Sequence, residues 1–139
     1  RANRVGFKMS LAGRRQTRAA VRRLSPTLHR HLSPAMTATA DAVAASARRQ
    51  VPVLTGALRR AIAVNRAGTT GEARVGIART RGAAGRDAPS VYAPLVEFGT
   101  SRSRGAPFMT PAAEGQRRPF LTRLRRAGKQ TERDLRRRG

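Results

Sequence analysis

One stretch, residues 91–111, constrains the fold more than any other. It reads VYAPLVEFGTSRSRGAPFMTP and contains the only tyrosine, Tyr92, and two of the four phenylalanines, Phe98 and Phe108. The whole sequence is only 4% aromatic, and aromatic side chains contribute the largest burial per residue. We therefore expect this stretch to anchor the hydrophobic core.

Glycine and proline divide this stretch into three parts. Residues 92–98 predict a short apolar turn of helix, which Gly99 ends. Residues 101–105 predict a flexible polar loop. The chain then returns as a rigid apolar segment, in which Pro111 suits the first turn of a helix because proline is tolerated there.

Upstream, the pattern predicts a long helix. Apolar residues recur at steps of three and four, and they are Leu28, Leu32, Met36, Ala40, Val43 and Ala47. The helix can start at Pro26 with a kink at Pro34, or at Pro34 outright, because each proline follows a serine typical of an N-cap. It ends by Gln50, since Pro52 disfavours a helical residue before it. Its alanines would let another helix or a sheet approach closely.

Two strands are expected next. Residues 57–62 lead into a strand that reaches about Asn65, and residues 74–78 return as the second strand of a hairpin. In the returning strand, apolar residues alternate with small or polar neighbours. Residues 80–90 contain two glycines and a proline, so they predict a mobile loop.

The chain closes with a second helix, which starts near Pro111 and is interrupted at Gly115 and Pro119. Its expected apolar side consists of Phe120, Leu121, Leu124 and Leu135. Together the elements predict an α+β fold: a long N-terminal helix packed on a small antiparallel β-sheet, with a C-terminal helix. By length this is one domain, formed by residues 25–139, while residues 1–24 form a basic N-terminal arm and helix.

Two motifs resemble the neck and tail-completion family of long-tailed bacteriophages and prophages. One is the aromatic stretch, where YAPLVEFGT and APFMTPA flank the polar loop; the other is VPVLTGALRRAI at residues 51–62. Two motifs in this order and spacing are far more specific than either alone. The residues that carry the resemblance are Pro52, Thr55, Gly56, Leu58, Arg59, Tyr92, Glu97, Phe98, Gly99, Thr100, Pro107, Phe108 and Pro111.

The resemblance implies a structural virion protein at the head-to-tail junction, made in the host cytoplasm. Copies would form a ring homo-oligomer, expected to be a hexamer, that joins the head connector to the tail around the DNA path. The implied partners are other neck proteins: the head-closure or connector protein and the tail terminator or tail tube. A tail terminator and a head-closure stopper are alternatives, because both have a similar size and fold class.

The net charge of +23 predicts a polyanionic partner. The sequence has 30 Lys+Arg against 7 Asp+Glu, and nearly all the basic residues are arginines, which bind phosphates and carboxylates through a planar fork. They could contact packaged DNA non-specifically, dock onto acidic protein surfaces, or simply be solvated. A basic DNA-condensing protein is therefore a further alternative. The candidate contacts are Arg14, Arg15, Arg18, Arg22, Arg23, Arg136, Arg137 and Arg138.

We expect no catalytic, cofactor-binding or metal site. The absence of cysteine excludes disulfides and thiolate metal ligands. His29 and His31 are two residues apart, so on a helix they point to different faces. The seven acids are scattered and no pair suggests acid–base catalysis, so an enzyme is not expected. Neither a membrane-spanning run nor a signal peptide is expected.

Glu97 is the most informative acid, because it lies in an apolar segment expected to be half buried. One interpretation is a bidentate salt bridge to an arginine, such as Arg59 or an arginine of a neighbouring subunit. The other is an exposed acid at a helix end. The loops at residues 80–90 and 101–106 are candidates for inter-subunit contacts that become ordered on assembly.

Overall fold

The computed structural model describes residues 26–52, 56–67, 72–79, 85 and 88–139. The predicted basic arm and helix of residues 1–24, Thr55, the hairpin turn and most of the loop at residues 80–90 lie outside the described residues. The same is true of five of the candidate contact residues, Arg14, Arg15, Arg18, Arg22 and Arg23.

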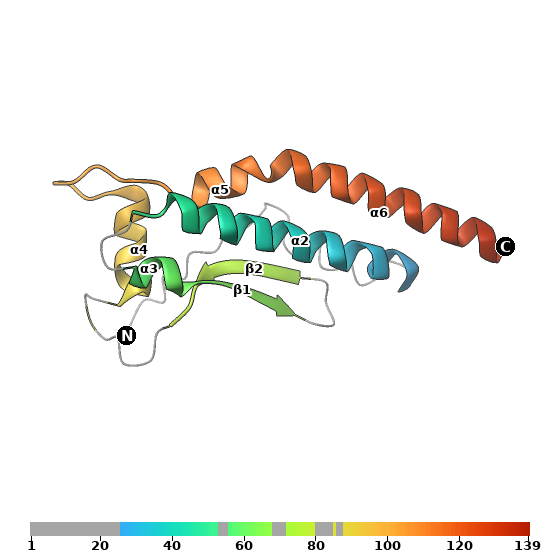
Figure 1. Ribbon diagram of the computed structural model, residues 1–139, viewed down its shortest axis with the longest axis horizontal. Helices are drawn as coiled ribbons and strands as arrows, with labels where there is room; N and C mark the ends of the chain where they lie inside the picture. Colours follow the sequence, from blue (N-terminus) through green and yellow to red (C-terminus); the bar gives the residue numbers. More distant parts are fainter. Residues whose placement is uncertain (1–25, 53–55, 68–71, 80–84, 86–87) are drawn as a thin grey trace.

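The central element is the helix α2 (Pro26–Gln50). It contacts α3 (Ala57–Ala61), α5 (Met109–Gly115), α6 (Arg117–Arg138) and both strands of the sheet. Figure 1 shows α2 between the strands on one side and α6 on the other, with α4 (Pro89–Phe98) at one end of the molecule. The α+β fold predicted from the sequence is confirmed, with its long N-terminal helix, small antiparallel sheet and C-terminal helix.

Small side chains explain how α2 can pack against the sheet on one side and against α6 on the other. α2 has the bounds that the first sequence alternative gave it, and it continues through Pro34. Ala40, Ala44 and Ala47 are buried along it. Because alanine projects little beyond the backbone, neighbouring elements can lie close to the helix axis, as the sequence predicted.

The sheet is a two-stranded antiparallel hairpin of β1 (Ile62–Ala67) and β2 (Glu72–Ile77). Ile62 pairs with Ile77, and Val64 pairs with Val75. Since alternate residues of a strand point to the same face, these apolar residues share one face, and Ile62 is fully buried on it. Arg48 at the end of α2 donates a hydrogen bond of 2.7 Å to the carbonyl oxygen of Ile62, which fixes the start of β1.

Residues 57–62 lead into a strand, as the sequence predicted. Residues 57–61 form the short helix α3, and the chain passes directly from it into β1. The segment reads ALRRA, and alanine, leucine and arginine are the strongest helix formers. The strand begins only at the β-branched Ile62, whose side chain favours extended backbone.

The hydrophobic core joins residues from both motifs to α2. The aromatic stretch contributes Phe108 and Met109, and the upstream motif contributes Leu58. Tyr92, Val96 and Val64 pack around this cluster and are partly buried. The buried members of the cluster are Val43, Ala44, Ala47, Val51, Leu58, Ile62, Ala93, Phe108, Met109 and Ala112.

The C-terminal segment is broken once rather than twice. α5 ends at Gly115, as predicted, but Pro119 lies in the first turn of α6, where a proline interrupts nothing. The predicted apolar side of α6 was also partly wrong. Leu121 and Leu135 are 45% and 49% exposed, whereas Ala127 and Thr131 are buried.

Polar contacts explain which side of α6 faces α2. Arg123 donates a hydrogen bond of 3.1 Å to the Thr39 hydroxyl. Near the other end, the Nε2 atom of His31 lies 2.7 Å from Asp134, and this hydrogen bond lowers the pKa of the Asp134 carboxyl. Arg123, Ala127, Thr131 and Asp134 are spaced by three or four residues, so they share one face of the helix.

His31 is therefore occupied by an ion pair or hydrogen bond to α6. The described residues contain no group of three or more His, Asp or Glu side chains that could hold a metal ion. Among the same residues, no helix combines the length and the apolar character needed to cross a membrane.

Replacing Ala127 by leucine should destabilise the fold. The larger side chain would push α6 away from α2, and overpacking of this kind costs about 1–3 kcal/mol of the free energy of unfolding. Thermal unfolding followed by circular dichroism measures the effect. The control is Gln130→Leu, which adds the same side chain at an exposed position of the same helix and should change stability by less than about 0.5 kcal/mol. Equal melting temperatures for the two variants would contradict the packing described above.

Candidate assembly site

The two halves of the aromatic stretch meet around one buried carboxylate. Glu97 is the last residue but one of α4, and it is only 3% exposed. One carboxylate oxygen accepts hydrogen bonds from the backbone N–H groups of Phe108 at 2.8 Å and Met109 at 2.9 Å. The other accepts a hydrogen bond of 2.8 Å from the N–H of Thr110. All three donors lie at the N-terminus of α5.

Glu97 thus caps α5 from a distance. The first N–H groups of a helix have no partner within the helix, and Phe108, at the N-cap position, offers no side-chain hydrogen bond. A carboxylate there satisfies the donors and interacts favourably with the helix dipole. The interpretation of Glu97 as an exposed acid is therefore wrong, and among the described residues no salt bridge joins it to Arg59. A contact with an arginine of a neighbouring subunit stays a prediction.

The hydrogen bonds also control the charge state of Glu97. Burial acts to raise the pKa of its carboxyl, but hydrogen bonds from the Thr110 side chain and from three backbone N–H groups outweigh it, so that the pKa is lowered. The carboxylate is consequently ionised at neutral pH. No signal of this was present in the sequence, because a helix starting near Pro111 would have Thr110 at its N-cap. In the structure α5 starts earlier, at Met109, which leaves Phe108 at the N-cap and requires an acceptor from elsewhere.

Two glycines allow the backbone at the end of α4 and the backbone shortly before α5 to pass in close contact beside this carboxylate. We call this contact the crossing of Gly99 and Gly105. Gly99 ends α4 with a φ of 80°, a conformation that side chains disfavour. A Cβ atom on Gly99 would lie 2.5 Å from the backbone nitrogen of Gly105, and one on Gly105 would lie 2.7 Å from the carbonyl carbon of Phe98. The N–H of Ala106 then donates a hydrogen bond of 2.7 Å to Val96. Gly105 was not singled out from the sequence.

The polar loop between these glycines is a hydrogen-bonded turn. The N–H of Thr100 donates to the carbonyl of Ser103 at 2.8 Å, and the Thr100 hydroxyl accepts from the N–H of Ser103 at 3.0 Å. Gly99 and Arg104 form an isolated antiparallel bridge. In Figure 1 the loop projects from the end of the molecule where α4 lies. The loop predicted to be flexible is therefore closed at its base by the hydrogen bonds of Thr100 and by the bridge between Gly99 and Arg104.

The upstream motif lies against α4 through α3. Gly56, with a φ of 73°, occupies the N-cap of α3, where left-handed backbone favours glycine. Leu58 is buried in the core, whereas Pro52 and Arg59 are exposed. The structure thus brings the two motifs together, although residues 63–90 separate them in the sequence.

The remaining residues of the aromatic stretch divide between core and surface. Phe108 is buried, Tyr92 is partly buried, and Pro111 is half-buried in the first turn of α5. Thr100 and Pro107 are exposed. At the other end of the chain, the three candidate contacts in the last turn of α6 are exposed as well; they are Arg136, Arg137 and Arg138.

Three large apolar side chains of α4 face the solvent, so this segment is half buried, as the sequence predicted. Val91, Leu95 and Phe98 are 50%, 51% and 67% exposed. They are spaced by four and three residues, so they share one side of the helix, which we call the α4 apolar face. Ala93 and Glu97 lie on the opposite, buried side. Phe108 and Met109 already fill the core, so a short helix can bury only one of its sides.

Comparison with known proteins identifies one family. The sequence matches the family described as "Bacteriophage HK97-gp10, putative tail-component" over residues 15–99, which is more than half of the chain. The matched residues include the upstream motif and α4. A search of curated proteins found no match, and a search of solved structures found none either.

Replacing Glu97 by glutamine should destabilise the fold by about 2–4 kcal/mol at pH 7, because an uncharged amide replaces a carboxylate that accepts three buried hydrogen bonds. The pKa of Glu97 is lowered in the folded state, so its contribution is full above the unfolded-state value of about 4.3 and is lost as the pH falls through the lower folded value. The gap in melting temperature between wild type and variant should therefore be constant from pH 7 to about pH 5 and narrow in stronger acid.

The matched control is Glu114→Gln, at an exposed position of α5, which should change the free energy of unfolding by less than about 0.5 kcal/mol. A Glu97→Gln protein that melts like this control at pH 7 would refute the capping role.

Replacing Gly105 by alanine should cost about 2–4 kcal/mol, because the new Cβ atom would meet backbone atoms that cannot move independently. Gly128→Ala makes the same chemical change in the interior of α6, where the added carbon meets nothing within 4 Å. That control should stabilise the protein by about 0.5–1 kcal/mol, since alanine is the better helix former. Thermal unfolding measures both changes in stability. Changes of the same sign in the two variants would contradict the close backbone contact at Gly105.

Proposed function

Because the chain belongs to the bacteriophage HK97-gp10-like family of tail components, we propose that it is a structural virion protein whose copies form a ring at the head-to-tail junction. The ring, sixfold in this proposal, would join the head connector to the tail around the path of the DNA. Its other contacts would be neighbouring neck proteins, namely the head-closure protein and the tail terminator or tail tube. The role is mechanical and requires no catalytic group.

The observation that most supports this proposal is the exposed α4 apolar face. Two copies of a chain with a net charge of +23 repel each other, so they must meet through a surface that adds no further cations. α4 contains no lysine or arginine, and its one acid, Glu97, is buried. Exposed apolar side chains on such a surface gain about 25 cal/mol for each Å² of apolar area that contact removes from water.

The motif residues explain why this face is presented in a fixed orientation. The Glu97 carboxylate ties the end of α4 to the start of α5, and the crossing of Gly99 and Gly105 locks the turn between them. A ring closes only if each interface repeats the same rotation. A face held by buried hydrogen bonds and backbone contacts meets that requirement, whereas a face on a loose loop would not.

Two alternatives stand beside this proposal. A tail terminator or a head-closure stopper would use the same ring-forming surface at a neighbouring level of the junction. A basic DNA-condensing protein is favoured by the net charge of +23; such a protein would act as a monomer and would have no use for an exposed apolar face.

The double variant Leu95→Gln/Phe98→Gln should abolish ring formation. Analytical ultracentrifugation of the full chain, at a salt concentration that screens charge repulsion, should find the wild type as a closed oligomer of about six copies. The variant should sediment as a monomer. Both replaced side chains are largely exposed, so the melting temperature of the monomer should change little.

The control is Leu121→Gln/Leu135→Gln, which removes two leucines of similar exposure from α6 and should leave the oligomer intact. A wild-type chain that stays monomeric at every concentration while it coats DNA would support the condensing protein instead. Loss of the oligomer in both double variants would show that the α4 apolar face has no special role.

A further inference from the structure

The side of α6 that faces away from α2 carries a row of basic side chains. Successive residues of the row are three or four positions apart, except for the adjacent Arg125 and Arg126, and the row therefore lies along one side of the helix. We call this side the α6 outer face; its residues are Arg118, Thr122, Arg125, Arg126, Lys129, Arg133 and Arg136. All of them are exposed.

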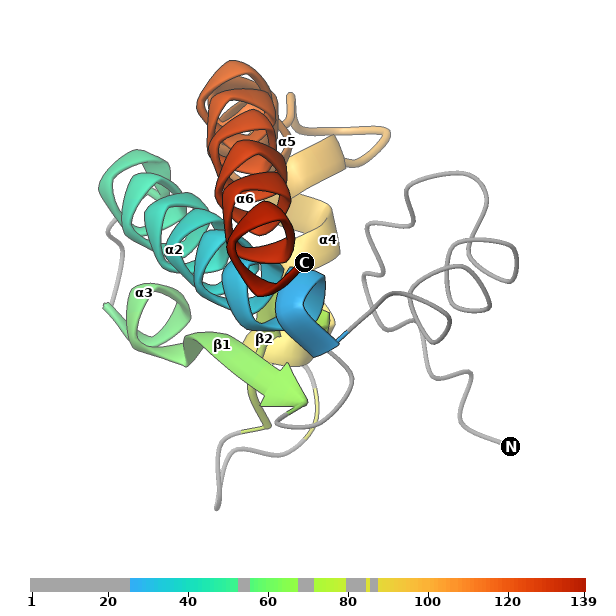
Figure 2. The same ribbon diagram turned by 90° about the vertical axis from the view of Figure 1, so that its right-hand side faces the viewer.

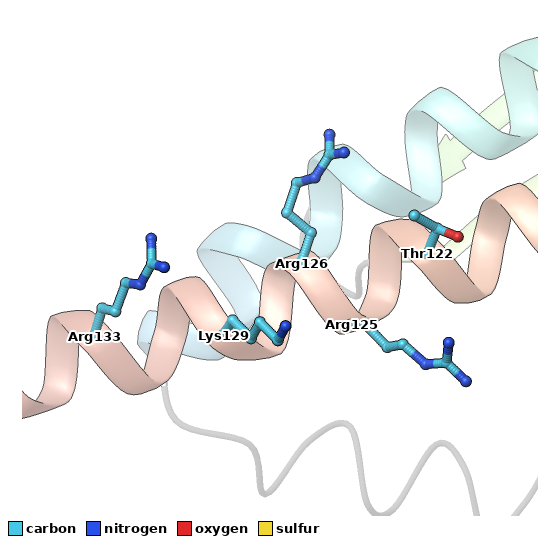
Figure 3. A pocket seen from close by; sticks show the side chains of 5 residues that line it. All are labelled: Thr122, Arg125, Arg126, Lys129 and Arg133. Carbon is cyan, nitrogen blue, oxygen red and sulfur yellow. The ribbon is translucent and has the colours of Figure 1, made fainter.

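A shallow, open hollow lies in the middle of this face and is lined by Thr122, Arg125, Arg126, Lys129 and Arg133. Figure 3 shows the four basic side chains extending from the helix with their charged ends apart from one another. The hollow thus presents several separate hydrogen-bond donors rather than a single deep pocket.

Little negative charge offsets this row. α6 contains ten basic residues and two acids, Glu132 and Asp134. Asp134 is turned towards α2, where it contacts His31, and Glu132 pairs with Arg136 at 2.6 Å. Among the described residues, no acid forms a salt bridge with any of the four basic side chains of the hollow.

We propose that the α6 outer face binds the phosphate backbone of duplex DNA without regard to base sequence. Arginine forks match phosphate oxygens, and α6, with 22 residues, is about 33 Å long at 1.5 Å per residue. That length corresponds to about one turn of B-form DNA.

Two features favour duplex DNA over other polyanions. The centre of a protein–protein interface is enriched in aromatic residues and methionine and, apart from arginine, depleted of charged residues, whereas the α6 outer face has no aromatic residue or methionine and consists almost entirely of cations. Proteins that bind single strands stack the bases on aromatic side chains. The only aromatic residue of α6 is Phe120, which is partly buried and is not on the outer face.

The residues of the α6 outer face lie outside the family match, which ends at residue 99. DNA binding by this face does not depend on whether copies of the chain form a ring. Of the candidate contacts predicted from the sequence in this helix, Arg136, Arg137 and Arg138, only Arg136 belongs to the α6 outer face.

The test compares two triple variants of the full chain. Arg125→Gln/Lys129→Gln/Arg133→Gln removes three cations from the hollow, and Arg49→Gln/Arg60→Gln/Arg79→Gln removes three exposed cations from other elements. Fluorescence anisotropy with a 30-base-pair duplex, over a series of salt concentrations, gives the affinity and its salt dependence for each protein. A duplex of unrelated sequence is measured in parallel, and a polyglutamate peptide serves as an acidic-protein probe.

The α6 variant should bind both duplexes at least about tenfold more weakly at 0.1 M salt. The slope of log affinity against log salt should be less steep by about 2.7, because each phosphate that the protein no longer neutralises reduces the slope by about 0.9. The control variant should change the slope by less than about 1. Equal decreases in affinity for the two variants would show that net charge alone governs binding, and would overturn the proposal.

A second result would also overturn it: a hollow variant that keeps its DNA affinity but no longer binds polyglutamate would assign the face to an acidic protein. Circular dichroism checks that both variants fold, since all six replaced side chains are exposed. A failure of DNA binding is distinguishable from a failure of the ring, because oligomer mass is measured separately and with other variants.

Discussion

The buried carboxylate of Glu97 is the interaction on which the arrangement of the other elements depends. It accepts three backbone hydrogen bonds at the start of α5, and a carboxylate removed from water is stable only with such partners. It therefore joins the end of α4 to the segment that leads into α6. Phe108 and Met109, which donate two of the bonds, also fill the core. Hydrogen bonds and apolar packing thus both hold the end of α4 against the start of α5, and we call this connection the α4–α5 joint.

The α4–α5 joint lies between two surfaces that differ in charge, the α4 apolar face and the α6 outer face. The α4 apolar face carries no basic residue, while α6 carries ten. Figure 1 shows α4 at one end of the molecule and α6 extending along α2 towards the other, and Figure 2 shows α6 and α2 side by side. A strongly cationic chain can then offer one surface to another protein and a different one to a polyanion, without bringing the cations of two copies together.

The sequence was a good guide where structure is determined by neighbouring residues. The end of α2 at Gln50, the end of α4 before Gly99 and the break at Gly115 all follow from local proline and glycine signals, whereas the sequence left the start of α2 open between Pro26 and Pro34. It failed where a distant partner decides the outcome. Whether Glu97 pairs with an arginine or caps a helix depends on a segment eleven residues away. Whether Leu121 or Ala127 faces inward depends on how α6 is rotated against α2, and hydrophobicity alone pointed to the leucine.

The crossing of Gly99 and Gly105 has a consequence for how the chain can vary. The two backbones touch at the base of the turn, so nothing larger than hydrogen fits there. The tip, formed by Ser101, Arg102 and Ser103, is exposed, and its hydrogen bonds to Thr100 lie at that base. The length and the side chains of the tip can therefore change with little effect on the stability of the fold. A lineage of such proteins can exchange the tip to suit a new neighbour while it keeps the same scaffold.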